Sequence, residues 1–550
     1  MLRKVLYTVL VLALTANVVP AASAAPKPAP DPRAWPSVYE PVSMSAAELL
    51  ASSRRVAGDT RKLESIRITY DVHDGGLDGT EQYVRRGQDT RDDETLGPLI
   101  TAGGRYKGER WDLGENGYTL IKRGIHQRDA ANARALEQVE PGENVRVLGR
   151  LRAPADVYVL RVAPSGGREE RDFYDATTFH LVRVETYVLD KLVVTTYDDY
   201  RTVGVFSAAY RTEFSDGHPE NDSFWTIREF IPGGPVNEAE VQIAHGRRAA
   251  VTFPAGVETV RLPARIDEYG RIIVRVVIKG RGLDFQLDSG ADGIFIDRSI
   301  AKELGLRVYG QWCQTVAGTF SAGKAVVPNL KIGKIGMDDV VINAVPFTDQ
   351  ANPNTKIVGL LGFDFIAGGV IKIDYQNETV DAMRYDHAMP KDAFEMDAIL
   401  DDGVPMIEMG INGAISNRFI VDTGATDVLV FSGFSKKHPE ALQDNSPGQI
   451  FSYAFNSVSA DGVGGKLHTR GLALDRMQIG IAAFKNFLAL VMSGDQPAFE
   501  GEDTDGVIGA TVLSAFDVYL DYGNSRVLFA PNKSAKEHGT ARGIDYLRWY

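Results

Sequence analysis

Two short segments each place an aspartate after an apolar stretch and before a small turn. The first reads Phe285-Gln-Leu-Asp288-Ser-Gly-Ala291 and the second reads Phe419-Ile-Val-Asp422-Thr-Gly-Ala425. A carboxyl group can act as a general acid or a general base, and two of them a few ångströms apart can share one proton. Such a pair could draw a proton from water and polarise a carbonyl group, which is the chemistry of amide hydrolysis.

The residues around each aspartate have identifiable roles. The apolar residues before it predict a buried strand that holds the carboxyl group rigidly. We expect the hydroxyl groups of Ser289 and Thr423 to hydrogen-bond neighbouring backbone and brace the turns. Gly290 and Gly424 would allow a close backbone approach that a Cβ atom would block.

Two further elements repeat in the same order. Gly359-Leu-Leu-Gly362 corresponds to Gly506-Val-Ile-Gly509, and the strand ending Asp374-Tyr375 corresponds to the one ending Asp521-Tyr522. The interval from the first glycine to the aspartate is 15 residues in both copies (374 minus 359, 521 minus 506). This pattern predicts an internal duplication, with each apolar-glycine element forming a second strand behind its turn. A pseudo-twofold axis between the copies would bring Asp288 and Asp422 together.

The sequence offers no second catalytic arrangement. It has no HExxH motif among its nine histidines and no GxSxG motif, and its single cysteine, Cys313, has no obvious catalytic partner. The histidines show no metal-ligand spacing. We therefore expect neither a metal nor a cofactor.

Residues 262–533 resemble aspartic proteases, and they are most similar to retropepsin-like enzymes, whose signature is Asp-Thr/Ser-Gly-Ala. The resemblance implies two β lobes with a substrate cleft between them, a catalytic pair Asp288 and Asp422, and glycine-rich flaps over the cleft. Order along the chain places the flaps at 316–323 and 461–466, where the candidate substrate-binding glycines are Gly318, Gly323, Gly462, Gly464 and Gly465. Flap backbone would bind an extended peptide by strand pairing.

The chain departs from the retropepsin pattern at several positions. Phe363 and Ala510 stand where retropepsins often have an arginine, so Asp292 and Asp427 need other partners or lie in the cleft. We expect both to be structural acids, and we expect Asp374 and Asp521 to be turn residues. Retropepsins usually pair two identical chains, whereas both halves are fused here, so we expect a monomer.

The N-terminal half predicts a different unit. A helix is expected after Ser45, with Glu48 completing the cap and Gly58 ending it. Period-two stretches at 65–72, 157–162 and 180–188 then predict a long antiparallel sheet. Residues 171–184 and 197–203 faintly resemble the half-barrel of periplasmic lipoprotein carriers, a resemblance that transfers no site.

The first residues predict a secretory signal peptide, with Arg3 and Lys4, an apolar run from Val5 to Val19, and Ala22-Ser-Ala24. No later stretch is apolar enough to span a membrane. We therefore expect an exported protein, periplasmic or secreted. The 550 residues are 44% hydrophobic and 24% charged, with a net charge of -13, which argues against nucleic-acid binding.

Together these features predict a mainly β protein with a bilobal aspartic-protease fold behind an N-terminal antiparallel β domain with one helix. The expected parts are a signal peptide (1–24), a proline-rich linker (25–44), the N-terminal domain (45–255), lobe 1 (262–390), lobe 2 (399–533) and a C-terminal tail (534–550). The expected function is an exported aspartic endopeptidase acting on peptides or proteins. The alternatives are an inactive peptide-binding module and an envelope lipid or lipoprotein carrier.

Overall fold

The protein is mainly β, as the sequence predicts, and is organised around several sheets. The structure is a computed structural model. It describes residues 16–18, 31–123, 126–138, 144–188, 191–245, 251–315, 319–346, 356–385, 387, 389–401, 403–443, 458–462, 465–492, 504–533, 540–541, 544–545 and 547–549.

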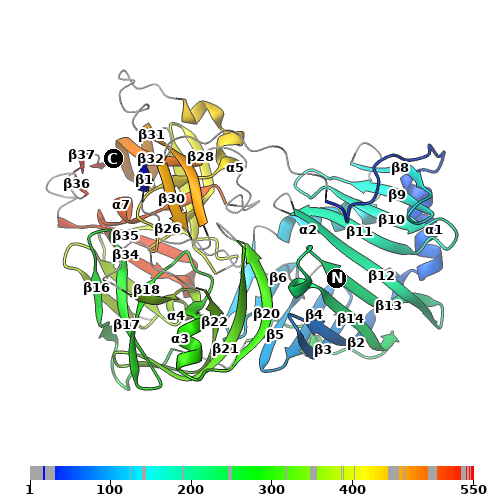
Figure 1. Cartoon of the computed structure of the whole chain (residues 1–550), viewed down its shortest axis with the longest axis horizontal. Coiled ribbons are helices and arrows are strands. Elements are labelled where there is room, and N and C mark those ends of the chain that lie inside the picture. The colour runs from blue at the N-terminus through cyan, green and yellow to red at the C-terminus, as the bar shows by residue number, and fades with distance from the viewer. Residues whose placement is uncertain are drawn as a thin grey trace.

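The N-terminal region forms one antiparallel sheet of 13 described strands, which lies beside the two lobes in Figure 1. The three strand segments predicted from period-two patterns all fall within its strands β2, β9 and β11 apart from His180, which precedes β11. In sheet order the strands are β7 (Thr119–Lys122), β6 (Glu109–Leu113), β5 (Leu99–Tyr106), β4 (Asp89–Leu96), β3 (Leu77–Arg86), β2 (Ser65–Asp74), β14 (Ser223–Pro232), β13 (Phe206–Ser215), β12 (Lys191–Val203), β11 (Leu181–Val188), β10 (Glu170–Asp175), β9 (Val157–Val162) and β8 (Val145–Leu151).

Two α-helices accompany this sheet. Helix α1 (Ala46–Ala57) begins with the predicted capping box, because Ser45 and Glu48 hydrogen-bond each other's backbone N–H, and it ends at Gly58. Its buried face contributes Leu49 and Leu50 to a cluster with strand residues of the sheet. A second helix, α2 (His126–Gln138), corrects the expectation of one helix. Its weak amphipathic pattern explains why the sequence did not predict it.

The two predicted lobes share one strand order. The first-lobe sheet runs β16 (Ala264–Ile266), β17 (Ile272–Ile278), β18 (Arg281–Leu287), β23 (Ile357–Leu361), β19 (Ile294–Asp297), β22 (Ile335–Val345), β21 (Thr319–Ile332), β20 (Val308–Thr315). The second-lobe sheet runs β1 (Ala16–Val18), β30 (Val458–Gly462), β31 (Gly465–Ile479), β27 (Met406–Ile411), β28 (Ala414–Val421), β33 (Gly506–Ile508), β29 (Leu429–Val430), β32 (Ala482–Met492), β38 (Leu547–Trp549). The order β18-β23-β19-β22 therefore recurs as β28-β33-β29-β32.

Short helices recur in matching places. Helix α3 (Arg298–Glu303) follows β19 as α5 (Ser432–Lys437) follows β29, and α4 (Phe363–Ile366) follows β23 as α7 (Ala510–Leu513) follows β33. The remaining described helices are single 3-10 turns, η1 (Thr60–Lys62), η2 (Pro219–Asn221), η3 (Glu238–Glu240), η4 (Pro439–Leu442) and η6 (Tyr522–Asn524). The matching order of strands and helices confirms the internal duplication.

A third sheet joins the lobes. It runs β15 (Thr259–Arg261), β25 (Thr379–Met383), β24 (Val370–Asp374), β34 (Phe516–Asp521), β35 (Arg526–Pro531) and β26 (Phe394–Asp397). At its centre the duplicated strands β24 and β34 pair antiparallel, with Val370 opposite Asp521 and Asp374 opposite Asp517. The start of each strand thus lies opposite the end of the other strand, which is the register that a twofold axis between the two copies requires.

Strands occur in two segments that the sequence predicts to be the signal peptide and the C-terminal tail. Strand β1, within the predicted signal peptide, pairs with β30, and β38, within the predicted tail, pairs with β32. A separate two-stranded sheet joins β36 (Thr540–Ala541) to β37 (Ile544–Asp545). Strand β15, which belongs to the third sheet, lies just before the expected start of lobe 1.

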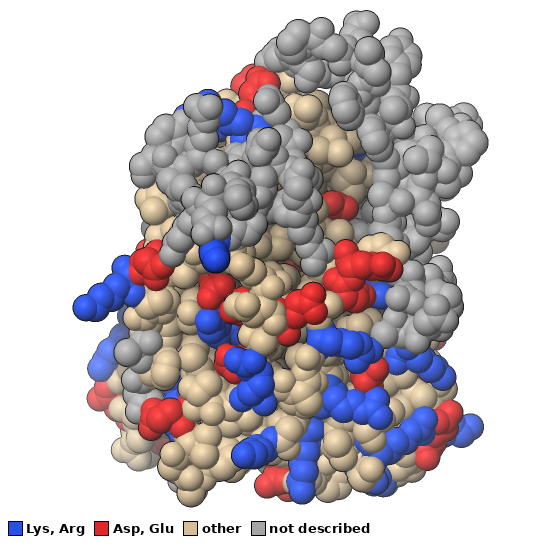
Figure 2. All heavy atoms as spheres, turned by 90° about the vertical axis from the view of Figure 1, so that its left-hand side faces the viewer, with Lys and Arg blue, Asp and Glu red and all other residues tan. Residues whose placement is uncertain are grey.

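No described helix combines the length and the apolar character needed to cross a membrane. On the face drawn in Figure 2, basic and acidic side chains alternate over the described surface without forming a large patch of one sign.

One apolar cluster runs through both lobes and the third sheet, and it includes Phe285, Phe419, Ile373 and Val518. Ile373 on β24 lies opposite Val518 on β34 and is fully buried. The sheet between the lobes is therefore part of their common core.

We expect Ile373→Ala to lower the free energy of unfolding by about 2 to 5 kcal/mol, because it opens a cavity in this core. The control is Ile415→Ala, which removes the same atoms from a side chain that is 62% exposed. Chemical denaturation measures both. Equal effects of the two substitutions would contradict a shared core at β24 and β34.

Candidate active site

The two aspartates predicted to act together lie at equivalent places in the two lobes. Asp288 follows β18 directly and Asp422 follows β28 directly. Each of these strands pairs in parallel with the strand of its apolar-glycine element, β23 or β33. The backbone N–H of Asp288 donates to Leu361 O and that of Asp422 donates to Ile508 O, both at 3.0 Å. The second strand behind each turn is therefore confirmed.

The two carboxyl groups have matching environments. Oδ1 of Asp288 accepts a hydrogen bond from Gly290 N at 2.9 Å, and Oδ1 of Asp422 accepts one from Gly424 N at 2.7 Å. Both side chains are fully buried, and Oδ2 of each receives no hydrogen bond from the described protein donors. Each Oδ2 is therefore free of protein donors among the described residues.

The hydroxyl groups beside the aspartates connect the two copies. Ser289 Oγ donates to Val421 O at 2.7 Å, and Thr423 Oγ1 donates to Leu287 O at 3.0 Å. In return, Ser289 N donates to Thr423 Oγ1 at 3.0 Å and Thr423 N donates to Ser289 Oγ at 2.9 Å. The backbone partners belong to the opposite copy, so these hydroxyl groups hold the two loops together, whereas the sequence predicts that each braces its own turn.

The two glycines are required by the approach of the opposite aspartate. A Cβ atom at Gly290 would lie 2.6 Å from Asp422 Cγ, and one at Gly424 would lie 2.5 Å from Asp288 Cγ. Both distances are far shorter than a carbon–carbon contact allows. The structure thus brings Asp288, Asp422 and their supporting residues into one compact site.

Burial and proximity raise the pKa values of both acids. Loss of water raises the pKa of Asp288 well above its usual range, and the charge of Asp422 and the hydrogen bond between the two side chains raise it further. Loss of water also raises the pKa of Asp422 to about 6, although hydrogen bonds from Asp288, Gly424 and Ala425 oppose this shift. Because the two acids lie close together and titrate as a pair, the second proton is held after the first has left.

Two residues that sequence reasoning missed support the pair. Gln286, buried on β18, donates from Nε2 to Gly424 O at 2.9 Å across the contact between the copies. Tyr522, buried behind the first loop, donates to Ser289 O at 3.4 Å and stacks on Phe363. The signal for Gln286 is an amide side chain between the apolar residues Phe285 and Leu287, just before the aspartate. Tyr522 has no such local signal, because its position depends on the third sheet.

Apolar residues from both copies surround the site. One buried cluster contains equivalent pairs such as Ala291 with Ala425 and Phe295 with Leu429, together with Phe320 of β21. Such walls exclude water, which strengthens the interaction between the two acids.

The acids that follow the pair have different environments in the two lobes. Burial lowers the pKa of Lys324, but the nearby carboxylates of Glu115 and Asp292 raise it above its usual value. Asp292 thus interacts electrostatically with a buried lysine, whereas the retropepsin pattern often supplies an arginine in this part of the lobe. Burial raises the pKa of Asp427 to about 6.

Asp374 and Asp521, expected to be turn residues, are the last residues of strands β24 and β34, and their side chains hydrogen-bond the turns that follow. Asp374 accepts hydrogen bonds from Asn377 N and Nδ2, and Asp521 accepts them from Asn524 and Arg526.

The predicted flaps fall on two β-hairpins. Strands β20 and β21 pair up to Thr315 and Thr319, and β30 and β31 pair up to Gly462 and Gly465. Gly318 and Gly464 lie outside the described residues. Gly323 lies inside the sheet opposite Ala344, where a Cβ atom would lie 2.5 Å from Val308 Cγ1. Close packing in the sheet therefore explains this glycine.

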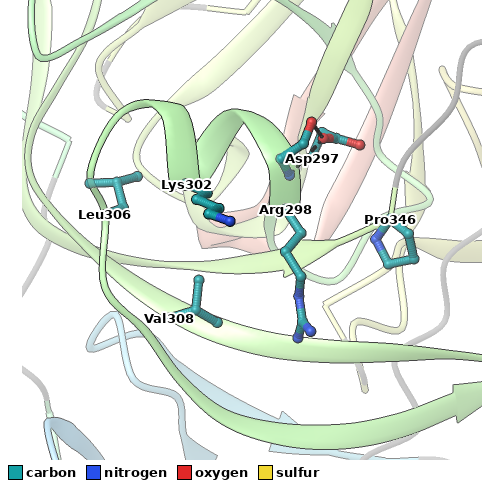
Figure 3. A pocket seen from close by; sticks show the side chains of 7 residues that line it. Asp297, Arg298, Lys302, Leu306, Val308 and Pro346 are labelled. Atoms are coloured by element: carbon teal, nitrogen blue, oxygen red, sulfur yellow. Dashed lines mark hydrogen bonds between the residues drawn. The ribbon is translucent and has the colours of Figure 1, made fainter.

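A pocket of about 560 Å³ lies beside α3 in the first lobe. Figure 3 shows the Arg298 side chain reaching from α3 towards the space between Val308 and Pro346. The other lining residues are Asp297, Ser299, Lys302 and Leu306, so neither member of the aspartate pair lines this pocket. Among the described residues, no group of three or more His, Cys, Asp or Glu side chains has a metal-binding arrangement.

Comparison with known proteins supports an aspartyl-protease region in the first lobe. Residues 274–365 match a family described as aspartyl protease. No curated protein matches the chain significantly.

Among solved structures, a DUF1329 family protein from Desulfovibrio piger is similar to 36% of this chain and 97% of its own, with 11% identity and a TM-score of 0.28. Conglutin gamma, a basic 7S globulin from lupine seeds, is similar to 52% of this chain and 98% of its own, with 12% identity and a TM-score of 0.32. TM-scores this low do not establish a shared fold.

We expect Gly290→Ala to lower the free energy of unfolding by about 1 to 3 kcal/mol, because the added methyl group overlaps the Asp422 carboxyl group. Gly336→Ala is the control, since a Cβ atom there meets nothing within 4 Å. Denaturation of both variants tests the close approach of the two loops. If the Gly290→Ala variant unfolds with the same free energy as the Gly336→Ala variant, the two loops must lie farther apart than the structure shows.

Proposed function

We propose that this protein is an exported, single-chain aspartic endopeptidase that hydrolyses peptide bonds with water activated between Asp288 and Asp422. One observation carries the proposal: two buried carboxyl groups from duplicated halves lie against each other, each with an Oδ2 atom that no described protein donor occupies. The match of residues 274–365 to the aspartyl-protease family supports the same chemistry.

The proposed reaction uses one proton shared by the two acids. The ionised member of the pair removes a proton from a water molecule held by the two carboxyl groups while that water attacks the peptide carbonyl carbon. The protonated member donates a hydrogen bond to the carbonyl oxygen as negative charge develops on it. The tetrahedral intermediate then collapses, and the departing amine takes a proton from the pair.

The supporting residues hold this geometry without taking part in proton transfer. The crossed hydrogen bonds of Ser289 and Thr423 fix the distance between the loops, and the two glycines let the carboxyl groups meet. An extended peptide would pair with the hairpins β20–β21 and β30–β31, which is a common way for a protein to bind peptide backbone. Export, inferred from the N-terminal sequence, would place such substrates outside the cytoplasm.

The test is digestion of a mixed peptide library by the chain lacking residues 1–24, with mass spectrometry of the products. We expect cleavage that pepstatin blocks, and a fall in kcat of about a thousandfold or more in Asp288→Asn and Asp422→Asn, because each removes one half of the proton-sharing pair. Asp338→Asn, an exposed position on β22, is the matched control and should keep wild-type activity.

Full activity in either dyad variant would refute the mechanism. Binding of peptides without turnover by the wild-type protein would instead support a non-catalytic peptide-binding module. Copurification of acyl chains with the protein would favour the lipid or lipoprotein carrier.

The pH dependence should report the raised pKa values. Below about pH 6 both acids hold protons and no base is available; above it one acid of the pair ionises while the other keeps its proton. We therefore expect kcat/KM to rise as the pH rises through about 6, and to fall again only when the second proton leaves. Steady-state assays from pH 3 to 9 measure the profile. An acid limb near the ordinary aspartate pKa of about 4 would contradict the buried pair.

A further inference from the structure

Three neighbouring strands of the first lobe each form a hydrogen bond or an ion pair with residues of the N-terminal domain. They are β20, β21 and β22, which form one edge of the first-lobe sheet and include the hairpin β20–β21, where the first flap is expected. Figure 1 shows these strands on the side of the lobe that faces β4, β5 and β6.

The edge strand β20 is held through its backbone. Asn221 donates from Nδ2 to Cys313 O at 2.8 Å, and its Oδ1 accepts from Cys313 N at 2.7 Å. Two residues earlier, Gln311 N donates to Gly75 O at 2.8 Å. An edge strand has unpaired backbone groups, and here the N-terminal region supplies partners for three of them.

Trp312 adds a side-chain contact at the same place. Its Nε1 donates to Asp74 Oδ1 at 3.2 Å, and its ring lies so close to Gly75 that a Cβ atom there would be 2.2 Å from Trp312 Cε2. Gly75 also has a φ of +56°, a conformation that glycine adopts without strain. The ring packs with Tyr70 and Val72 of β2 in an apolar cluster.

The other two strands are held by the turn between β6 and β7. Asn116 donates to Val341 O and accepts from Val341 N, each at 2.8 Å, on β22. Its neighbour Glu115 forms an ion pair with Lys324 of β21 at 3.2 Å, and both side chains are largely buried. The side chain of Asn116 hydrogen-bonds both the N–H and the C=O group of Val341, as a residue of a neighbouring strand would. The contact therefore fixes where β22 lies along the turn as well as its distance from the turn.

The hairpin held in this way reaches the aspartate pair. Strand β21 begins at Thr319, and its next residue, Phe320, belongs to the buried cluster that contains Ala291 and Ala425. Movement of β20 and β21 would therefore displace an apolar wall of the site.

From these contacts we infer that the N-terminal domain is a built-in support of the peptide-binding site, and that Asn221 is a positioning residue for the hairpin β20–β21. The inference rests on the proposed function. A peptide that binds by strand pairing needs an ordered backbone partner, and a hairpin ordered beforehand loses less conformational entropy on binding. The domain thus serves the folded enzyme.

The experiment compares Asn221→Ala with Asn132→Ala in the otherwise complete mature chain. Asn132 makes the same two-bond contact, to Arg168 O at 3.0 Å and from Arg168 N at 2.9 Å, but both partners lie inside the N-terminal domain. We expect Asn221→Ala to raise KM for a peptide substrate about tenfold with little change in kcat, because two bonds to β20 are lost. Asn132→Ala should leave KM unchanged.

Hydrogen exchange of residues 308–315 provides a readout that does not require activity. We expect faster exchange there in Asn221→Ala than in the wild type or Asn132→Ala, while thermal unfolding of the two variants stays similar. Asn221→Asp keeps the acceptor for Cys313 N but places an oxygen atom against Asp216 Oδ2 and Cys313 O, so it should not restore the wild-type KM.

The outcomes separate the two proposals. Equal KM values for Asn221→Ala and Asn132→Ala, or faster exchange without a change in KM, would overturn the support role while leaving the aspartate mechanism intact. A wild-type protein without peptidase activity would refute the proposed function, and exchange at 308–315 would then still decide whether Asn221 holds β20.

Discussion

Two acids buried against each other are unstable unless they share a proton, and this constraint organises the rest of the molecule. Asp288 and Asp422 come from equivalent loops, and each sits against a glycine of the opposite copy that leaves room for its carboxyl group. The crossed hydrogen bonds of Ser289 and Thr423 hold the loops at that separation. The paired strands β24 and β34 then keep the two lobes in twofold register. Each feature depends on the duplication, because one half alone would supply a single acid.

The symmetry is incomplete where the two lobes meet other parts of the chain. In the first lobe, Asp292 faces Lys324, and Lys324 is paired with Glu115 of the N-terminal region. Gln286 adds a hydrogen bond to Gly424, and the equivalent residue of the second copy is the apolar Ile420. These differences give the two loops unequal environments, which suits a reaction that needs one acid protonated and the other ionised.

Much of the site was predictable because its signals are local. The aspartate turns, the glycines behind them and the cap at Ser45 depend on residues a few positions apart, and all lie where the sequence predicts. What the sequence could not predict depends on contacts between distant segments. The opposite-copy partners of Ser289 and Thr423 are one case, and the docking of Asn221 and Asn116 onto the first lobe is another. Helix α2 was missed because its apolar periodicity is weak.

The central claim is that Asp288 and Asp422 hold one proton jointly at neutral pH. Carboxyl ¹³C NMR titration of aspartate-labelled protein, with signals assigned through Asp288→Asn and Asp422→Asn, measures this directly. The account predicts that one of the two carboxyl groups ionises near pH 6 and that the pair keeps its second proton at pH 7. Two carboxyl groups that are both ionised by pH 5 would contradict it, because they would have to lie apart or in contact with water.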